Sequence, residues 1–195
     1  DVDIILGIGF ATAIHLSKLP ALSKPVLIPL APDPRFSGSP LAGGVSGKKN
    51  LSYLSYPGGV AEDLKLLQRL TSAKRVHILV DAVLPQLLPR VGAVLARLGK
   101  ELGTPLTTIV AGESVAETTQ RIPPDVEALY VTPQVRLSDD ERKALIGGLT
   151  KKGIPTFSMR GRIEVDEGML ATKTRGTDMV KLARRTAFNL ERVLR

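Results

Sequence analysis

The stretch RVHILVDAVLPQLLPRVGAVLARLGKELGTPLTTIVA (residues 75–111) contains two apolar runs separated by a helix-like segment. The runs RVHILVD (75–81) and PLTTIVA (105–111) are largely continuous in apolar residues, which is typical of strands covered on both faces. The intervening segment 84–102 is long enough to be a crossover helix. A strand, a helix and a second strand in this order predict a parallel sheet with right-handed crossovers.

The same alternation of strand-like and helix-like segments continues along the chain. The other strand-like runs are residues 3–9, 25–31, 50–56, 127–133 and 155–159. The other helix-like segments are 12–19, 59–70, 114–121, 138–152 and about 177–194. Ser138 and Glu141 have the spacing of a capping box, which supports a helix start at that point. The sequence therefore predicts an α/β protein with parallel sheets.

Two passages interrupt this alternation. Residues 31–50 are rich in Pro, Gly and Ser, and residues 160–176 contain a strand-like GMLATK without a preceding crossover helix. A compact α/β block between two irregular passages indicates two lobes, with the chain crossing between them more than once. The acidic side chains of the second passage, Glu164, Asp166 and Glu167, are expected to be solvated.

Composition excludes several classes of function. The 195 residues carry a net charge of +8, but the 27 Lys and Arg are scattered, so we expect a solvated surface and no nucleic-acid partner. The chain contains no cysteine, which excludes disulfides, thiol catalysis and Cys-based zinc sites. No apolar run approaches the roughly 20 residues that span a bilayer.

The glycines of DIILGIGFAT (3–12) raise the question of a dinucleotide-binding loop. A dinucleotide fingerprint needs a third glycine or alanine three residues after the second glycine, and this chain has Thr12 there. The bulky Phe10 also stands where a pyrophosphate would approach the backbone. The plainer interpretation is a tight turn that presents Phe10 and Thr12 at the carboxyl edge of the sheet, where α/β proteins bind ligands.

Residues for catalysis or metal binding are not grouped in the sequence. His15 and His77 have no partner at ligand spacing, and no recognisable catalytic motif occurs. We therefore expect no enzymatic activity, no metal and no cofactor. Six of the seven aromatic residues lie at strand ends or just after them, so they either fill the core or line one ligand cleft. These six are Phe10, Phe36, Tyr53, Tyr56, Tyr130 and Phe157.

Several segments of the chain resemble, in the same order, the substrate-binding components of uncharacterised ABC-type transport systems. The resemblance rests on DVDIILGIGFATA, PVLIPLAPDP, GKKNLSYLSY, LKLLQRLTSAKRVHILVD, EALYVTPQ, GIPTFSM and EGMLATKTRGTDMVKLARRTAFNLERVL. It implies the type 1 periplasmic binding protein fold, with a ligand between two Rossmann-like lobes. Members with known ligands look like binders of amino acids, notably aromatic ones.

The resemblance also implies a set of ligand-contact positions at strand ends. They are Phe10, Ala11, Thr12, Asp33, Ser55 and Tyr56 in the first lobe, and Asp81, Ala82, Pro133, Gln134, Met159 and Arg160 in the second. The chain departs from the family at several of these positions. It has Phe10 where the family commonly has a small hydroxyl residue. It has Pro133-Gln134 where a Thr-Asp pair is usual, and Met159-Arg160 where Ser-Asp is usual. The expected pocket is therefore more apolar, with one added positive charge and one carboxylate fewer.

The resemblance further implies a domain division and a set of partners. The first lobe comprises residues 1–56 plus 170–195 and is expected to be truncated at its N-terminus, and the second comprises 57–169, with hinges near 52–57 and 169–174. An uncovered apolar edge of the first lobe predicts a homodimer. The implied function is a non-catalytic, periplasmic or extracellular, membrane-associated solute-binding component that binds a small organic ligand and delivers it to an ABC permease. The alternatives are a ligand-sensing domain of a receptor or regulator, and a nucleotide-using α/β enzyme.

Overall fold

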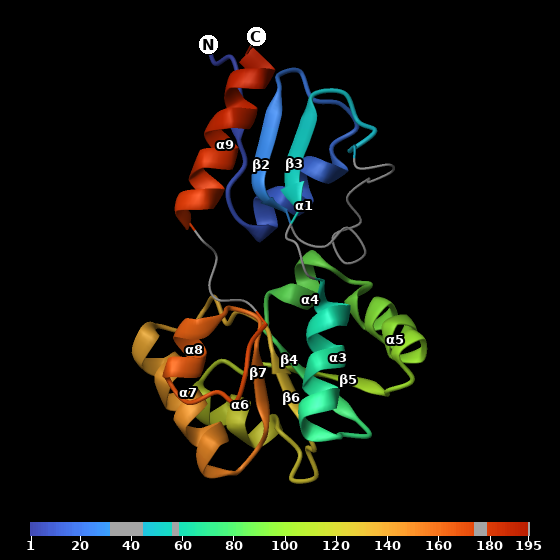
Figure 1. The fold of residues 1–195 in the computed structure, drawn as a ribbon, viewed down its shortest axis with the longest axis vertical. Helices are drawn as coiled ribbons and strands as arrows, with labels where there is room; N and C mark the ends of the chain where they lie inside the picture. The colour runs from blue at the N-terminus through green and yellow to red at the C-terminus, as the bar shows by residue number, and fades with distance from the viewer. Residues whose placement is uncertain (32–44, 56–58, 174–178, 195) are drawn as a thin grey trace. The chain divides into compact units, whose positions relative to one another are not determined.

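The computed structural model describes residues 1–31, 45–55, 59–173 and 179–194. The chain divides into two compact units (Figure 1). Unit 1 comprises Asp1–Gly59 and Asp178–Arg195, and unit 2 comprises Val60–Thr177. The chain therefore passes twice between the units, once after Gly59 and once before Asp178.

Unit 1 is built on a parallel sheet of three strands in the order β1-β2-β3. The strands are β1 (Ile5–Leu6), β2 (Val26–Ala31) and β3 (Leu51–Ser55), and the helices in this unit include α1 (Phe10–Lys18) and α9 (Met179–Leu194). Ile5 pairs with Val26, and Val26 pairs with Leu51. The register between β2 and β3 shifts after Ile28, so that Ala31 pairs with Ser55. The small core of unit 1 consists of Ala13, Val26, Ile28, Ala31 and Leu51.

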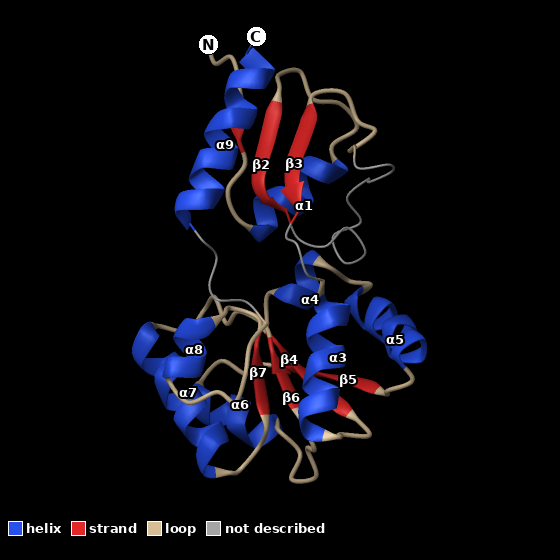
Figure 2. Cartoon of the chain, viewed as in Figure 1, coloured by secondary structure: helices blue, strands red, loops and turns tan. Residues whose placement is uncertain are grey.

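Unit 2 contains a parallel sheet of four strands in the order β5-β4-β6-β7. The strands are β4 (Val76–Val80), β5 (Leu106–Val110), β6 (Leu129–Val131) and β7 (Thr156–Ser158). The helices are α3 (Val60–Thr71), α4 (Leu84–Leu87), α5 (Val91–Leu102), α6 (Val115–Arg121), α7 (Asp139–Lys151) and α8 (Arg162–Asp166). Figure 2 shows helices on both sides of this sheet, and every residue of β4, β6 and β7 is buried. The predicted α/β class with parallel sheets is confirmed.

The expected helix over residues 84–102 is two helices, α4 and α5. Pro89 lies between them, and the residue before it, Leu88, has φ −128° and ψ 75°. A residue that precedes proline is pushed out of the helical region by the proline ring, and proline has no N–H to donate. The break therefore follows from a single proline. The capping box of α7 is confirmed, since Ser138 and Glu141 accept from each other's backbone N–H groups.

The expectation that the acidic side chains of 160–176 are solvated is wrong for Glu164 and Glu167. Glu164 is 1% exposed and lies in α8, a helix that we did not predict within this passage. The Glu167 carboxylate accepts hydrogen bonds from the guanidinium of the buried Arg142, at 2.6 and 3.1 Å. Asp166 is exposed, as expected. Glu167 is held by Arg142, which is 25 residues away in sequence, and Glu164 accepts a hydrogen bond from Ser158 in the turn before α8. Local composition reveals neither contact.

Candidate functional site

The carboxyl ends of the strands of unit 2 bring the sequence-predicted site residues of that unit to one edge. Asp81 and Ala82 follow β4, Pro133 and Gln134 follow β6, and Met159 and Arg160 follow β7. The strands are parallel and in register, with Leu79 beside Val131 and Val131 beside Ser158. The loops after these neighbouring strands therefore lie beside one another, at the edge where α/β sheets bind ligands.

Asp81 joins two of these loops. Its side chain is 4% exposed, and its Oδ1 accepts a hydrogen bond of 2.9 Å from the backbone N–H of Val83. Its Oδ2 accepts a second, of 3.2 Å, from the backbone N–H of Arg136 in the loop after β6. Both carboxylate oxygens are thus bonded to backbone donors, and the carboxylate fixes the loop after β4 to the loop after β6.

A second connection runs from the loop after β5 to the loop after β6. The guanidinium of Arg136 makes a two-pronged contact with the carboxylate of Glu113, with Nη1 3.2 Å from Oε1 and Nη2 on Oε2. This contact lowers the pKa of Glu113 and raises that of Arg136. The sequence analysis selected neither residue, because the resemblance does not place a ligand contact at either position. Both lie in loops that follow strands, and that location is the signal that could have found them.

Gln134 presents an unsatisfied acceptor at this edge. The side chain is 5% exposed, and its Nε2 donates a hydrogen bond of 2.9 Å to the carbonyl of Thr132. Its Oε1 is buried and has no hydrogen-bond partner among the described residues. Since a buried polar atom without a partner is costly, the amide oxygen of Gln134 is suited to accept a hydrogen bond from a ligand or a water molecule.

The turn after β7 presents Met159 and Arg160, and Ser158 holds it in place. The Ser158 hydroxyl accepts a hydrogen bond of 2.9 Å from the N–H of Gly161 and donates one of 2.5 Å to Glu164 Oε2. Burial raises the pKa of Glu164, and the bond from Ser158 partly opposes this. Met159 and Arg160 are exposed. Unit 2 thus offers a rigid turn with one apolar and one cationic side chain open to solvent.

Unit 1 has a corresponding carboxyl edge. Phe10, Ala11 and Thr12 open α1 directly after β1, and Ser55 ends β3. The parallel order of the sheet places both features at the same edge, and Ala11 and Thr12 are exposed. The other two site residues predicted for this lobe, Asp33 and Tyr56, lie outside the described residues, as do parts of both hinges.

The aromatic residues of unit 2 belong to its core. Tyr130 and Phe157 are fully buried, and their rings stack with centroids 5.8 Å apart and planes inclined by 20°. For these two residues the core interpretation is correct. The described part of the chain contains no group of three or more His, Asp and Glu side chains placed to hold a metal ion. Its helices also include none with the length and apolar character that a membrane span requires.

Two α/β units with parallel sheets, linked by two passages of the chain, match the periplasmic-binding-protein-like fold of the solved structures that resemble this chain. Comparison with known proteins finds no family model and no curated protein that matches the chain. The likeness to solved structures is at the level of the fold.

Three solved structures illustrate this likeness. An ABC domain from Streptococcus pneumonia in complex with L-Trp has a TM-score of 0.67 and 17% identity, over 100% of this chain and 66% of that one. A ligand-free, open substrate-binding protein with adhesive properties from Clostridium difficile has a TM-score of 0.63 and 20% identity, over 98% of this chain and 64% of that one. A LacI family transcriptional regulator from Bifidobacterium animalis subsp. lactis has a TM-score of 0.58 and 16% identity, over 99% of this chain and 70% of that one. The chain thus spans less than two thirds of the length of the first two.

Proposed function

We propose that this chain is a non-catalytic solute-binding component of an ABC-type transport system. The observation that carries the proposal is the carboxyl edge of unit 2, where the buried Asp81 fixes the loop after β4 to the loop after β6. The exposed Glu113–Arg136 pair adds a weaker link to the loop after β5. Such fixed loops preorganise a binding surface and reduce the cost of ordering it around a ligand. The proposal includes delivery to a membrane permease, and a periplasmic or extracellular, membrane-associated location.

The proposed ligand is a small organic anion or zwitterion with an apolar body, such as an aromatic amino acid. Arg160 supplies an exposed positive charge beside the apolar Met159, and the amide oxygen of Gln134 supplies an acceptor. Arg160 would pair with the ligand carboxylate, and Met159 would pack on its apolar part. In unit 1, the start of α1 and the ends of β2 and β3 would contribute the other predicted contacts: Phe10, Ala11, Thr12, Asp33, Ser55 and Tyr56.

A thermal-shift screen tests the proposal. A true ligand raises the melting temperature in proportion to the logarithm of its concentration above Kd. The screen would compare the twenty amino acids, with L-Trp as the first probe, against mononucleotides and dinucleotides. We expect stabilisation by an amino acid and none by nucleotides. Stabilisation by dinucleotides alone would overturn the proposal in favour of a nucleotide-using enzyme.

A matched pair of variants tests the role of Arg160. Arg160→Ala removes the proposed carboxylate partner, whereas Arg162→Ala removes another exposed arginine, which pairs with Asp166 on α8. We expect Arg160→Ala to weaken binding of the stabilising amino acid at least tenfold in calorimetry, and Arg162→Ala to leave it unchanged. Equal effects of the two variants on binding would show that Arg160 does not contact the ligand.

The second candidate is a ligand-sensing domain of a receptor or regulator, and the likeness to a LacI family regulator favours it. Both candidates predict ligand binding, so binding alone does not separate them. The gene neighbourhood does, because a transport component is expected beside genes for a permease and an ATPase. Self-association through the uncovered edge of unit 1, expected from the sequence, also stands as a proposal.

A further inference from the structure

The loops between the strands of unit 2 and the helices that follow them carry four charged side chains. They are Asp81 after β4, Glu113 after β5, Arg136 after β6 and Arg160 after β7. Two of them are negative and two are positive, so the loops as a set carry no net charge. The side chain that lacks a partner decides which charged group of a ligand this edge can receive.

The two carboxylates of this set are already engaged. Asp81 is 4% exposed, and its two oxygens accept hydrogen bonds from the backbone N–H groups of Val83 and Arg136. Glu113 contacts the guanidinium of Arg136 through both of its oxygens. A ligand ammonium group that approached either carboxylate would compete with these contacts. The loops of unit 2, all of which lie in the described part of the chain, therefore offer no free carboxylate.

Arg160 is the charged side chain of these loops that lacks a partner. It is exposed, and it makes no hydrogen bond or ion pair with any described residue. Asp139 and Glu164 lie within its electrostatic range. Asp139 pairs with Arg142 instead. Glu164 is 1% exposed and accepts a hydrogen bond from Ser158. Because a guanidinium presents its N–H donors in a planar fork, the free Arg160 is suited to bind a carboxylate.

One acid near the edge has no partner of its own. Asp140 is exposed in the first turn of α7, and it makes no hydrogen bond or ion pair with a described residue. It lies in the helix and not in the loop after β6, at a position where a negative charge stabilises the start of the helix through the helix dipole. The helix therefore accounts for Asp140 without a ligand.

The same edge presents apolar surface to solvent. Val135 is 71% exposed and Met159 is 36% exposed, in the loops after the neighbouring strands β6 and β7. The loop that carries Val135 is fixed by Asp81, which accepts a hydrogen bond from the N–H of the next residue, Arg136. An exposed valine on a fixed loop, in the loop next to an exposed methionine, fits the apolar part of a small ligand.

We propose that the ligand is an organic acid with an apolar body and no positively charged group, and that Arg160 and Val135 select it. This inference rests on the proposed solute-binding function and narrows its ligand class. Arg160 receives the carboxylate, and Val135 and Met159 pack on the apolar body. A neutral group such as a hydroxyl takes the place of the ammonium of an amino acid. An ammonium group would lose its hydration without gaining a negative partner in these loops, so it weakens binding.

Calorimetry of the full chain with matched ligands tests the proposal. L-phenyllactate carries a hydroxyl where L-phenylalanine carries an ammonium, and L-indolelactate and L-Trp differ in the same way. We expect each hydroxy acid to bind about tenfold more tightly than its amino acid, or better. An amino acid that binds as tightly as its hydroxy acid overturns this proposal and leaves the solute-binding function standing. If neither kind of ligand binds, the proposed solute-binding function fails together with the proposal.

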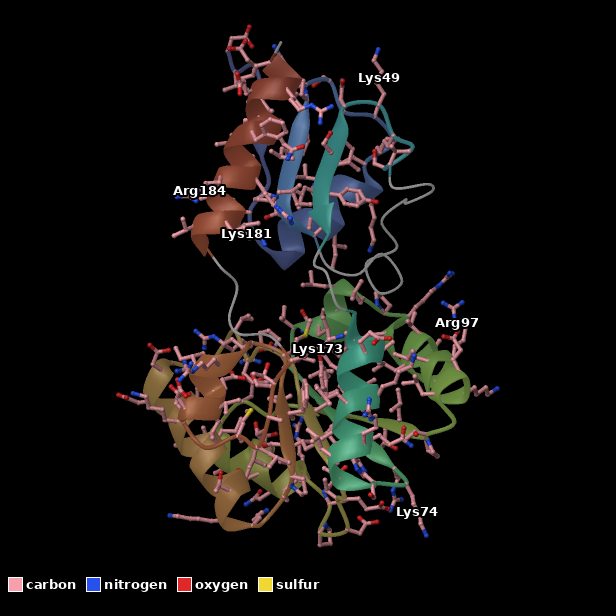
Figure 3. The ribbon with its side chains drawn as sticks, viewed as in Figure 1. Lys49, Lys74, Arg97, Lys173, Lys181 and Arg184 are labelled. Atoms are coloured by element: carbon pink, nitrogen blue, oxygen red, sulfur yellow. The ribbon has the colours of Figure 1, made fainter. Side chains whose placement is uncertain are left out.

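A pair of variants tests whether charge causes the preference. Val135→Asp places a free carboxylate at the edge on an exposed side chain, and the loss of its apolar contact affects both ligands of a pair alike. We expect it to reduce the preference for the hydroxy acid about fivefold or more. Lys74→Gln is the matched control, because it makes the same change in net charge before β4, at the opposite edge of the sheet. Figure 3 shows the Lys74 side chain there, directed into solvent.

The preference should be unchanged in Lys74→Gln. An unchanged preference in Val135→Asp, or an equal change in the control, overturns the proposal. Asp140→Asn should leave the affinities for both ligands of a pair as they are in wild type. A fall in amino-acid affinity in Asp140→Asn also overturns the proposal, because Asp140 would then hold a ligand ammonium group.

Discussion

The hydroxyl of Tyr130 donates a hydrogen bond of 2.9 Å to Oδ2 of Asp63, between β6 and α3 in the interior of unit 2. Asp63 is 5% exposed and Tyr130 is fully buried. Burial raises the pKa of the Asp63 carboxyl, and the bond from Tyr130 only partly opposes the rise. The folded protein thus holds the proton of Asp63 more tightly than the unfolded chain does.

The raised pKa makes stability depend on pH in a definite direction. The contribution of Asp63 to the free energy of unfolding is complete below the pKa that it has in the unfolded chain. It is lost as the pH rises through the higher pKa of the folded state. Asp63→Asn abolishes this titration. We expect the stability of wild type relative to Asp63→Asn, measured by urea unfolding, to fall as the pH rises above the ordinary range of an aspartate carboxyl. A difference that does not change with pH would contradict the raised pKa.

Local sequence patterns predict the strand–helix order because each element carries its own apolar period and its own caps. The strands of unit 2 are continuous apolar runs, and Ser138 and Glu141 mark the start of α7 at fixed spacing. The carboxyl edge is also predictable, since parallel strands all end on one side. The particular site residues in the loops after β4, β6 and β7 came from the resemblance to a known family, and the predicted parallel sheet accounts for their lying at one edge.

The contacts that order those loops could not be predicted from the sequence. Glu113 and Arg136 are 23 residues apart, and Ser158 meets Glu164 only because a short helix follows β7. Likewise, nothing near Glu164 in sequence indicates that its carboxylate is buried. Such pairs depend on which strands become neighbours, and the order β5-β4-β6-β7 is a property of the assembled sheet. The site residues could therefore be placed at an edge, but their partners could not be named.

Asp81 provides a test of the loop connections at the carboxyl edge. Asp81→Ala leaves the backbone N–H groups of Val83 and Arg136 without their acceptor, so we expect a loss of about 1–3 kcal/mol in the free energy of unfolding. Asp81→Asn retains one acceptor oxygen and should cost less. Hydrogen exchange of the ligand-free protein should show faster exchange at both N–H groups in Asp81→Ala. Unchanged protection at Arg136 would show that Asp81 does not join the two loops.

The buried ion pair between Arg142 and Glu167 predicts a large effect of a single truncation. The side chains are 3% and 14% exposed, and Glu167→Ala leaves the buried guanidinium without its main partner. Removing one member of a buried pair costs about 3–5 kcal/mol when the remaining charge has no other partner. Because Asp139 also pairs with Arg142, we expect a loss below that range. Asp166→Ala, which removes the exposed partner of Arg162, is the control and should have a much smaller effect. Urea unfolding measures both variants, and similar losses would mean that Arg142 is solvated.

Ser158 tests whether the turn after β7 depends on a buried acid. Ser158→Ala removes the one hydrogen bond that the Glu164 carboxylate accepts among the described residues, so the pKa of Glu164, already raised by burial, should rise further. The stability that depends on a protonated Glu164 is then lost at a higher pH than in wild type. Ser158→Thr keeps the hydroxyl and should restore the wild-type titration, which carbon-detected NMR of the Glu164 carboxyl can follow. If Ser158→Ala leaves that titration unchanged, the serine does not hold Glu164, and the turn that presents Met159 and Arg160 is fixed by other contacts.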